Sequence, residues 1–364
     1  MSNELSKLLS RPKSRRSFLA GTGAAAVGLT FSKAGFAADK AEEAKLNFYN
    51  WDTYIGETTL ADFNKASGID VNMSLFATND ELFAKLRAGN PGFDVIVPGS
   101  DFVERMIKAD MLIPLDRSKI PNVKNLAPEF MEADYDPGRK YSLAYTFLGI
   151  GIGYRKSKVK EVPNSWKVLF DSDQYKGRIA VMSDASELFR TAFRYLGQPA
   201  NSTDPELIKK VEAMLTKQKG NIKAFHEDNG QDLLLSGEVD VVMEYNGDIA
   251  QIMTEDKDID FVFPKEGGLR QSDTLAIPKG APHPENAHKF INYLLDAEVG
   301  AGISKTIKYP TPNAAAKALM PEDYKTNPVI FPPDDPFLKY EYVRYGGPEV
   351  TKLLDEALTR LRAS

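Results

Sequence analysis

The stretch Leu46-Asn47-Phe48-Tyr49-Asn50-Trp51 is predicted to form the first strand of the fold, and it begins a repeating pattern of apolar runs and helical segments. A helix is expected from about Thr58 to Ala66, ended by Gly68. Alternating apolar residues predict a strand at 69–75, and Phe93-Asp94-Val95-Ile96-Val97 indicates a fully buried strand. Strands that alternate with helices form βαβ units, so the sequence predicts an α/β fold with a mostly parallel sheet.

The same alternation continues through the second half of the chain. Asp204 followed by Pro205 is a typical N-cap and first residue of a helix. Further strands are expected at 178–182, 239–243, 260–263 and 274–277, and further helices at 80–87, from near Asp184, at 204–215 and at 284–295. Ligands of open parallel sheets bind beyond the carboxyl ends of the strands, so a binding site is expected in the turns that follow them.

The composition excludes several classes of protein and site. The 364 residues are 42% hydrophobic and 27% charged, which indicates a globular chain, of two domains by its length, rather than a disordered or collagen-like one. Because there is no cysteine, thiol nucleophiles, Cys-ligated zinc, iron–sulfur clusters and an N-terminal lipid-modified Cys are excluded. The three histidines, His226, His283 and His288, are predicted to be surface residues, and no metal or cofactor is expected.

The N-terminal residues resemble a twin-arginine export signal. Arg15 and Arg16 precede a weakly apolar run from Ala20 to Phe31, and an Ala-rich exit follows at 37–38. A run of about 12 residues is too short to cross a bilayer, so it is interpreted as a removable segment within a signal at 1–38. The alternative is a disordered basic tail. The signal predicts export to the periplasm, where a protein without a lipidation site diffuses freely.

Removal of residues 1–38 changes the net charge. The whole chain has 46 basic and 51 acidic residues and a net charge of −5, and the leader holds six of the bases and one of the acids. The remainder therefore has 40 bases and 50 acids, a net charge of −10. Nucleic acid is not expected as a partner, because phosphate binding needs a basic surface, and a cationic ligand becomes plausible.

Every predicted turn at a strand end contains an acidic residue. The segments are Trp51-Asp52-Thr53-Tyr54, Gly99-Ser100-Asp101-Phe102, Ser183-Asp184-Ala185-Ser186-Glu187 and Tyr245-Asn246-Gly247-Asp248, with Gln271-Ser272-Asp273 opening a later strand. A single acid at a helix start is explained by N-capping and the helix dipole. Five acidic segments directed toward one crevice go beyond capping, and they predict a negative site that prefers a cation.

Aromatic residues near these acids extend the prediction to an aliphatic amine. An ammonium group over an aromatic face gains roughly 0.5 to 2 kcal/mol, and each buried methylene adds about 0.8 kcal/mol. The rings expected to do this are Trp51, Tyr54, Tyr245 and Tyr309, whereas those assigned to core packing are Phe48, Trp166 and Phe263. An aliphatic diamine or polyamine would gain both the contact of ammonium groups with aromatic rings and the burial of methylene groups.

Four runs of the sequence resemble the periplasmic spermidine/putrescine-binding proteins of polyamine ABC importers. They are Phe-Tyr-Asn-Trp at 48–51, Val-Pro-Gly-Ser at 97–100, Phe-Pro-Lys-Glu-Gly-Gly at 263–268 and Tyr-Pro-Thr-Pro-Asn at 309–313. The resemblance extends from Leu46 to Asn313 and weakens after about Pro321. It implies a two-lobed periplasmic-binding-protein fold, type II-like, in which each lobe is a mostly parallel sheet flanked by helices and the ligand lies in the cleft between the lobes.

The resemblance also implies lobe boundaries and partners. Lobe one would comprise residues 45–148 and 272–317, and lobe two residues 149–271 and 318–364. The ligand would be a small polyamine, putrescine or spermidine, and the lobes would close on it. The closed form would dock on an inner-membrane ABC permease with its ATPase. A monomer without enzymatic activity is predicted.

Individual residues acquire roles only through this resemblance. It implies that Trp51 and Tyr54 line the methylene chain, that Tyr245 stacks from the second lobe and that Tyr309 completes the cage. Asp273 would form the main salt bridge to an amine, whereas the remaining polar contacts would come from Asp52, Ser100, Asp101, Asp184, Glu187 and Asp248, of which Asp248 matches an acid of putrescine-preferring members.

Some positions depart from the family pattern. Many relatives have a tryptophan where this chain has Gln271, and another where it has Tyr245. Gly99 and Asp101 replace a serine and an aromatic residue of the spermidine binder. Gln271 remains a candidate ligand-binding residue, and these changes leave the preferred amine undecided.

Two other classes of function are consistent with parts of the sequence. Asp184 and Glu187, three residues apart at a helix start, could perform acid–base catalysis in a hydrolase. However, the sequence contains no nucleophile elbow, phosphate-binding loop or zinc-protease motif. A protein of the same fold could instead bind an opine, an amino-acid derivative or another solute, or act as a sensor.

Overall fold

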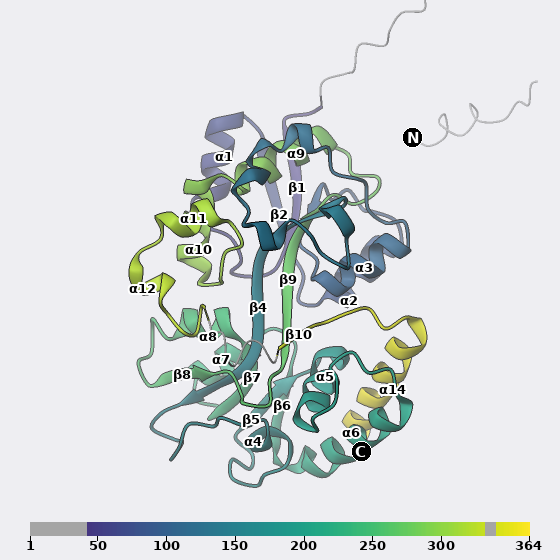
Figure 1. The fold of residues 1–364 in the computed structure, drawn as a ribbon, viewed down its shortest axis with the longest axis vertical. Coiled ribbons are helices and arrows are strands. Elements are labelled where there is room, and N and C mark those ends of the chain that lie inside the picture. The colour runs from purple at the N-terminus through teal and green to yellow at the C-terminus, as the bar shows by residue number, and fades with distance from the viewer. Residues whose placement is uncertain (1–41, 332–339) are drawn as a thin grey trace, which may run out of the picture. The chain divides into compact units, whose positions relative to one another are not determined.

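A continuous mixed sheet runs through the computed structural model, which describes residues 42–331 and 340–364 (Figure 1). The strand order is β2-β1-β3-β9-β4-β7-β5-β6, with β10 paired to β9 and β8 paired to β4. The strands are β1 Lys45–Asn50, β2 Asp70–Leu75, β3 Val95–Ile96, β4 Ser142–Arg155, β5 Ile179–Met182, β6 Ile222–His226, β7 Val241–Tyr245, β8 Ile259–Val262, β9 Leu269–Ala276 and β10 Glu341–Tyr342. The export signal predicted at 1–38 lies outside the described residues.

Helices flank both ends of this sheet (Figure 1). They are α1 Thr59–Ser67, α2 Asn79–Arg87, α3 Ser100–Lys108, α4 Lys167–Phe170, α5 Ala185–Tyr195, α6 Pro205–Gln218, α7 Gly230–Leu235, α8 Asn246–Ile252, α9 Pro284–Leu294, α10 Ala297–Ile307, α11 Ala314–Leu319, α12 Glu322–Lys325 and α14 Pro348–Ala363. Short 3₁₀ helices cover Arg117–Lys119, Pro121–Asn125, Pro128–Phe130, Pro137–Arg139 and Lys219–Asn221.

Two groups of parallel strands are joined by two long antiparallel ones. β2, β1 and β3 pair in parallel, and so do β7, β5 and β6. We call the elements around these groups the first half and the second half. β4 pairs antiparallel with β9 over residues 142–149 and with β7 and β8 over residues 150–155. β4 and β9 therefore run side by side from one half into the other (Figure 1).

Local sequence signals explain where the predicted helices begin and end. α1 ends at Gly68, whose positive φ of 73° is readily adopted by glycine. At the start of α6, the Asp204 side chain accepts a hydrogen bond from the Glu206 N–H, as the Asp-Pro signal predicts. Together with β1, β2 and β5, these elements confirm the predicted α/β alternation. β9 begins five residues before the strand expected at 274–277, and β4 and β6 were not predicted.

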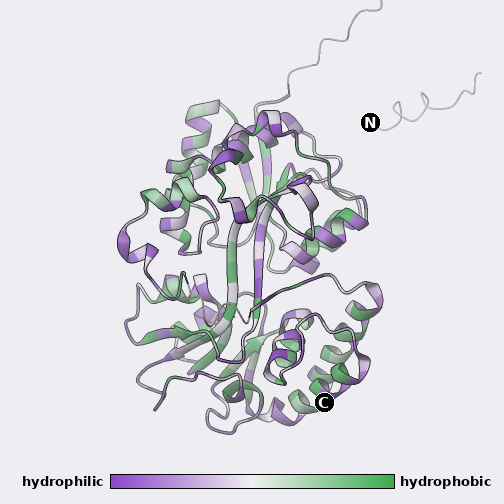
Figure 2. Cartoon of the chain, viewed as in Figure 1, coloured by the Kyte–Doolittle hydropathy of each residue, from purple (hydrophilic) through white to green (hydrophobic). Residues whose placement is uncertain are grey.

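Separate apolar cores fill the two halves. Phe48 and Phe290 make an edge-to-face contact in the first half, with ring centroids 5.1 Å apart. In the second half, the fully buried Trp166 donates its indole N–H to the Gly267 carbonyl. Phe48, Trp166 and Phe263 are all buried, which confirms their assignment to core packing. The helices carry both apolar and polar residues, as expected for elements between a sheet and solvent (Figure 2).

The prediction that the three histidines are surface residues is wrong for two of them. His226 is 3% exposed, its Nε2 lies 3.0 Å from the Met243 carbonyl oxygen, and burial lowers its pKa to about 4. His288 is 4% exposed and accepts a hydrogen bond from the Asp116 N–H. The polar neighbours of His226 suggested a loop, whereas the residue ends β6 and is covered by the first turn of α7.

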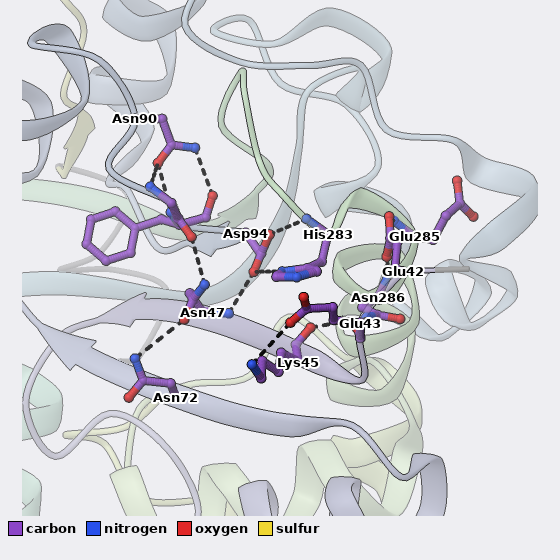
Figure 3. Close-up of polar contacts among 12 residues, drawn as sticks. Glu42, Glu43, Lys45, Asn47, Asn72, Asn90, Asp94, His283, Glu285 and Asn286 are labelled. Atoms are coloured by element: carbon purple, nitrogen blue, oxygen red, sulfur yellow. Dashed lines mark hydrogen bonds and ion pairs between the residues drawn. The ribbon is translucent and has the colours of Figure 1, made fainter. Parts of the chain in front are cut away.

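Hydrogen bonds join the start of the described chain to α9 (Figure 3). The fully buried Asp94 accepts hydrogen bonds from the backbone N–H groups of Asn47 and His283, both at 2.7 Å. Glu42 accepts another from the N–H of Asn286 in the first turn of α9, at 2.8 Å. These contacts fix β1 against α9.

Candidate functional site

A pocket lies where the turns that follow β1, β6 and β7 meet the middle of β9. It encloses about 460 Å³ of space between its atoms, including the solvent at its mouth. We call it the central pocket, and its lining residues are Trp51, Asp52, Thr53, Tyr54, Asn79, Leu148, Asp228, Gln231, Tyr245, Asp248, Gln271, Asp273 and Tyr309.

Eight of the twelve residues predicted from sequence line this pocket. They are Trp51, Asp52, Tyr54, Tyr245, Asp248, Gln271, Asp273 and Tyr309. The fold therefore brings together residues that are more than 250 positions apart in the sequence. Their role in ligand binding stays a prediction.

Asp273 lines the pocket and is held by the turn that follows β1. Its Oδ2 accepts a hydrogen bond of 2.7 Å from the Tyr54 hydroxyl, and both side chains are at least 94% buried. Trp51 is fixed nearby through its indole N–H, which donates to the Val97 carbonyl at 2.9 Å. Burial raises the pKa of Asp273 to about 7; the hydrogen bond from Tyr54 opposes this rise, and the neighbouring Asp248 adds to it.

A second carboxylate reaches the pocket from the first turn of α8. Asp248 accepts a hydrogen bond of 2.7 Å from the Tyr309 hydroxyl, so this contact joins the second half to the first. Glycine is required at position 247, because a Cβ there would lie 2.2 Å from the Tyr309 ring. Burial raises the pKa of Asp248 to about 7, although the hydrogen bond from Tyr309 opposes the rise.

Glu187 contacts the edge of the pocket without lining it. Its Oε1 accepts hydrogen bonds from the Tyr245 hydroxyl and from the Gln271 amide nitrogen, the latter at 2.9 Å. Glu187 is 7% exposed, and burial, together with the charge of Asp184, raises its pKa well above the usual range. We call these three side chains the Glu187 bridge. A carboxylate that already accepts two protein hydrogen bonds is a weaker candidate for binding an ammonium group than the sequence suggested.

Three other predicted residues lie away from the central pocket. Asp101 and Asp184 line a separate space of about 420 Å³, the side pocket, together with Arg105, Arg190 and Arg344. Burial raises the pKa of Asp184 to about 7 and that of Asp101 to about 6, and Arg190 opposes the latter rise. Asp184 also caps α5 by accepting from the Glu187 N–H at 2.9 Å.

Ser100 lines neither pocket. It is fully buried at the start of α3, and its hydroxyl has no hydrogen-bond partner among the described residues.

The structure adds five lining residues that sequence reasoning missed. They are Thr53, Asn79, Leu148, Asp228 and Gln231. Asp228 follows the end of β6, so the strand-end rule would have found it if Ile222–His226 had been identified as a strand. Burial and the nearby Asp248 raise the pKa of Asp228 to about 9.

The electrostatic character of the central pocket is negative. Its lining contains four carboxyl groups, on Asp52, Asp228, Asp248 and Asp273, and no lysine or arginine. Burying like charges together without a counter-charge is unfavourable, which is the physical cause of the raised pKa values. A cation in this pocket would favour the ionised carboxylates, and the rings of Trp51 and Tyr245 would contact its hydrocarbon part.

Within residues 42–331 and 340–364, no group of three or more histidine and acidic side chains is placed to hold a metal ion. No helix in the same part of the chain combines the length and the apolar character needed to cross a bilayer.

Comparison with known proteins identifies relatives over most of the chain. Residues 58–332 match the family described as bacterial extracellular solute-binding protein. The chain is 36% identical over 317 residues to the spermidine/putrescine-binding periplasmic protein of Escherichia coli, covering 86% of this chain and 89% of that protein. It is 34% identical over 308 residues to the putrescine/cadaverine-binding protein of Pseudomonas aeruginosa, covering 81% and 87%.

Solved structures show the same architecture. The crystal structure of the spermidine/putrescine ABC transporter substrate-binding protein PotD from Streptococcus pneumoniae, in complex with calcium and HEPES, superposes with a TM-score of 0.76 at 29% identity. The match covers 88% of this chain and 98% of that one. The α/β fold with a central sheet flanked by helices, as predicted from sequence, is therefore that of two-lobed periplasmic binding proteins.

Proposed function

Since the chain belongs to the family of bacterial extracellular solute-binding proteins, we propose that it binds a polyamine, putrescine or spermidine, and delivers it to an ABC importer. Its partners would be the polyamine, a membrane permease and the ATPase of that permease, and the protein would act as a binding component rather than an enzyme. The observation that carries the proposal is the central pocket, where buried carboxyl groups and aromatic rings share one cavity without a basic residue.

The location and the form of the protein are part of the same proposal. Relatives carry the word periplasmic in their names, which supports function in the periplasm. We propose that residues 1–38 are a twin-arginine signal that directs the chain there, and that the exported protein is a monomer. Export of a reporter fused to these residues should stop when Arg15 and Arg16 are both replaced by lysine.

Closing of two lobes around the ligand would explain how residues from both halves contact it. We propose lobes of residues 45–148 with 272–317, and 149–271 with 318–364. In support, β4 changes partner from β9 to β7 at residues 149–150. A ligand that contacts both lobes binds the closed form more tightly, so it shifts the equilibrium toward closure.

One ion pair across the halves tests this mechanism away from the pocket. Glu104 of α3 contacts the Arg344 guanidinium at 3.1 Å and accepts a hydrogen bond from the Tyr345 N–H. Loss of the pair would favour the open form. Because the pair is partly exposed, Glu104→Gln is expected to raise the polyamine Kd by only about two- to fivefold.

The matched control is Glu212→Gln, which breaks a pair with Arg360 that lies entirely within the second half, between α6 and α14. Calorimetric titration of both variants with the same polyamine is the measurement. Equal affinities for Glu104→Gln and the wild type would contradict a contribution of this pair to closure.

The proposed function itself is tested by calorimetry with a ligand panel. The panel comprises putrescine, cadaverine, spermidine, spermine, agmatine, an opine and free amino acids. Tight binding of at least one of the polyamines is expected. A folded protein that binds none of them would contradict the proposal, and a response to the opine or the amino acids alone would favour the alternative solute class.

A further inference from the structure

Two acceptor groups in the central pocket, the Asp228 carboxylate and the Gln231 side-chain oxygen, have no hydrogen-bond donor among the described residues. The Gln231 oxygen is fully shielded from solvent, and its amide nitrogen makes only a long contact of 3.5 Å to the Asp228 carbonyl. The buried Gln231 oxygen is unfavourable without a donor, and an ammonium group with three N–H donors could satisfy it together with the partly exposed Asp228 carboxylate.

Tight packing fixes the segment that carries these two groups. Gly230 lies between them, and a Cβ there would come within 2.3 Å of the Glu244 Oε2 and 2.6 Å of the His226 Cε1. Glu244 and His226 are 1% and 3% exposed, so the segment rests on a buried surface rather than on solvent. The side chains of Asp228 and Gln231 are therefore held toward the pocket by packing beneath them.

Charge distinguishes this part of the pocket from the side pocket. The carboxyl groups whose charges raise the pKa of Asp228 include those of Asp248, Asp52 and Asp273, all in the central pocket. The carboxyl groups whose charges raise the pKa of Asp184 include those of Asp80, Asp101 and Asp355, all in the side pocket.

The Glu187 bridge uses one oxygen of the Glu187 carboxylate, Oε1, which accepts both of its hydrogen bonds. The Asp228 carboxylate accepts no hydrogen bond from the described residues and is therefore available to an ammonium group.

We propose that Asp228 and Gln231 bind the second ammonium group of a short aliphatic diamine whose first ammonium group is bound at Asp273. This inference rests on the proposed function and assigns the ligand to the diamine class. Asp228 would be the residue that distinguishes a diamine from a monoamine with the same hydrocarbon chain, because the monoamine places a methyl group where the second ammonium would lie.

The experiment compares putrescine with n-butylamine on the wild type and on Asp228→Asn. The wild type should bind putrescine at least tenfold more tightly than n-butylamine. Asp228→Asn should raise the putrescine Kd by about tenfold or more, because it removes a partly buried counter-charge, and should change the n-butylamine Kd by less than about twofold. Direct calorimetry suits putrescine, and competition against a bound polyamine suits the weaker monoamine.

Asp232→Asn is the matched control. Asp232 lies four residues further on, in α7, and makes the same charge change at an exposed position outside the pocket lining. The charge of Asp232 also raises the pKa values of Asp228 and Asp248, but solvent screens a charge at an exposed position, so both Kd values should stay within about twofold of the wild type. Thermal unfolding of Asp228→Asn should occur at or above the wild-type temperature, because the substitution removes repulsion among buried carboxyl groups.

Equal losses for putrescine and n-butylamine in Asp228→Asn, or a loss no greater than that in Asp232→Asn, would overturn this inference while leaving the proposed function intact. If the wild type bound spermidine but not putrescine, the diamine assignment would be overturned, again without affecting the proposed class. Failure of the folded wild type to bind any amine would overturn both.

Discussion

Replacement of Asp273 by asparagine is expected to weaken polyamine binding by about a hundredfold or more, because it leaves a buried ammonium group without its counter-charge. Asp273 is 6% exposed and already accepts a hydrogen bond from Tyr54, so little water is available to replace the lost carboxylate. Asparagine has nearly the same shape, and the experiment therefore isolates the charge. Calorimetric titration with putrescine and with spermidine is the measurement.

Tyr54→Phe provides the graded comparison for Asp273→Asn. It removes the hydroxyl that donates to the carboxylate and leaves the charge in place, so a smaller loss of roughly three- to tenfold is expected. Unfolding does not explain a loss in Asp273→Asn, because neutralising a carboxyl whose pKa is raised to about 7 does not destabilise the protein without ligand. A change below about threefold in Asp273→Asn would contradict the assignment of the main amine contact.

The strand-end rule explains how much of the site could be predicted from sequence. Trp51 and Tyr245 lie at the ends of recognisable strands, and the fold brings them together as the rule requires, whereas Asp273 lies in the middle of β9. Asp228 obeys the same rule but follows β6, whose sequence Ile-Lys-Ala-Phe-His has neither strict alternation nor a continuous apolar run. The rule therefore applies to Asp228 as well, and this residue was missed because β6 could not be identified from its sequence.

Long-range packing explains the largest omission from the fold. β4 contains Gly149, Gly151 and Gly153, which lower the strand propensity of its sequence. In the structure, a Cβ at Gly151 would lie 2.2 Å from the Phe261 ring, and one at Gly153 would lie 2.6 Å from the Ile249 side chain. These glycines therefore admit β8 and α8 against β4, which is a property of residues about 100 positions away.

The positions of Ser100, Asp101 and Asp184 also depended on contacts that local sequence does not contain. Each lies at a helix start, as predicted, yet the Glu187 bridge connects the region of Asp184 to the central pocket through Gln271. A tryptophan at position 271, which the resemblance implies for many members of the family, could not donate a side-chain amide to Glu187 in this way. Glutamine at position 271 thus allows a hydrogen bond to Glu187, and only the packed structure shows this contact.

Polyamine affinity is expected to fall by about a hundredfold or more between pH 8 and pH 5, because each unit of pH below a pKa reduces the ionised fraction tenfold. Burial raises the pKa values of Asp273 and Asp248 to about 7 and that of Asp228 to about 9. The ammonium groups of an aliphatic amine remain charged over this range, so the change in affinity reports the carboxyl groups of the pocket.

Proton release gives an independent measure of the same effect. A bound cation favours the ionised carboxylates, so binding at pH 6 should release protons to the buffer. The measured enthalpy should then differ between phosphate and a buffer with a large ionisation enthalpy, such as imidazole. Equal enthalpies in both buffers together with an affinity independent of pH would contradict ionisation of these carboxyl groups on binding.

The same pKa shifts predict the opposite pH dependence for the stability of the protein without ligand. A carboxyl whose folded pKa exceeds its unfolded value binds more protons in the folded state, so its stabilising contribution is complete below about pH 4 and is lost as the pH rises toward 7. In Asp273→Asn this contribution is absent. The free energy of unfolding of the variant relative to the wild type should therefore be higher at pH 8 than at pH 4, and saturating polyamine should stabilise the wild type most at pH 8. Chemical denaturation of both proteins at the two pH values measures this difference, and an unchanged difference would show that folding does not raise the pKa of Asp273.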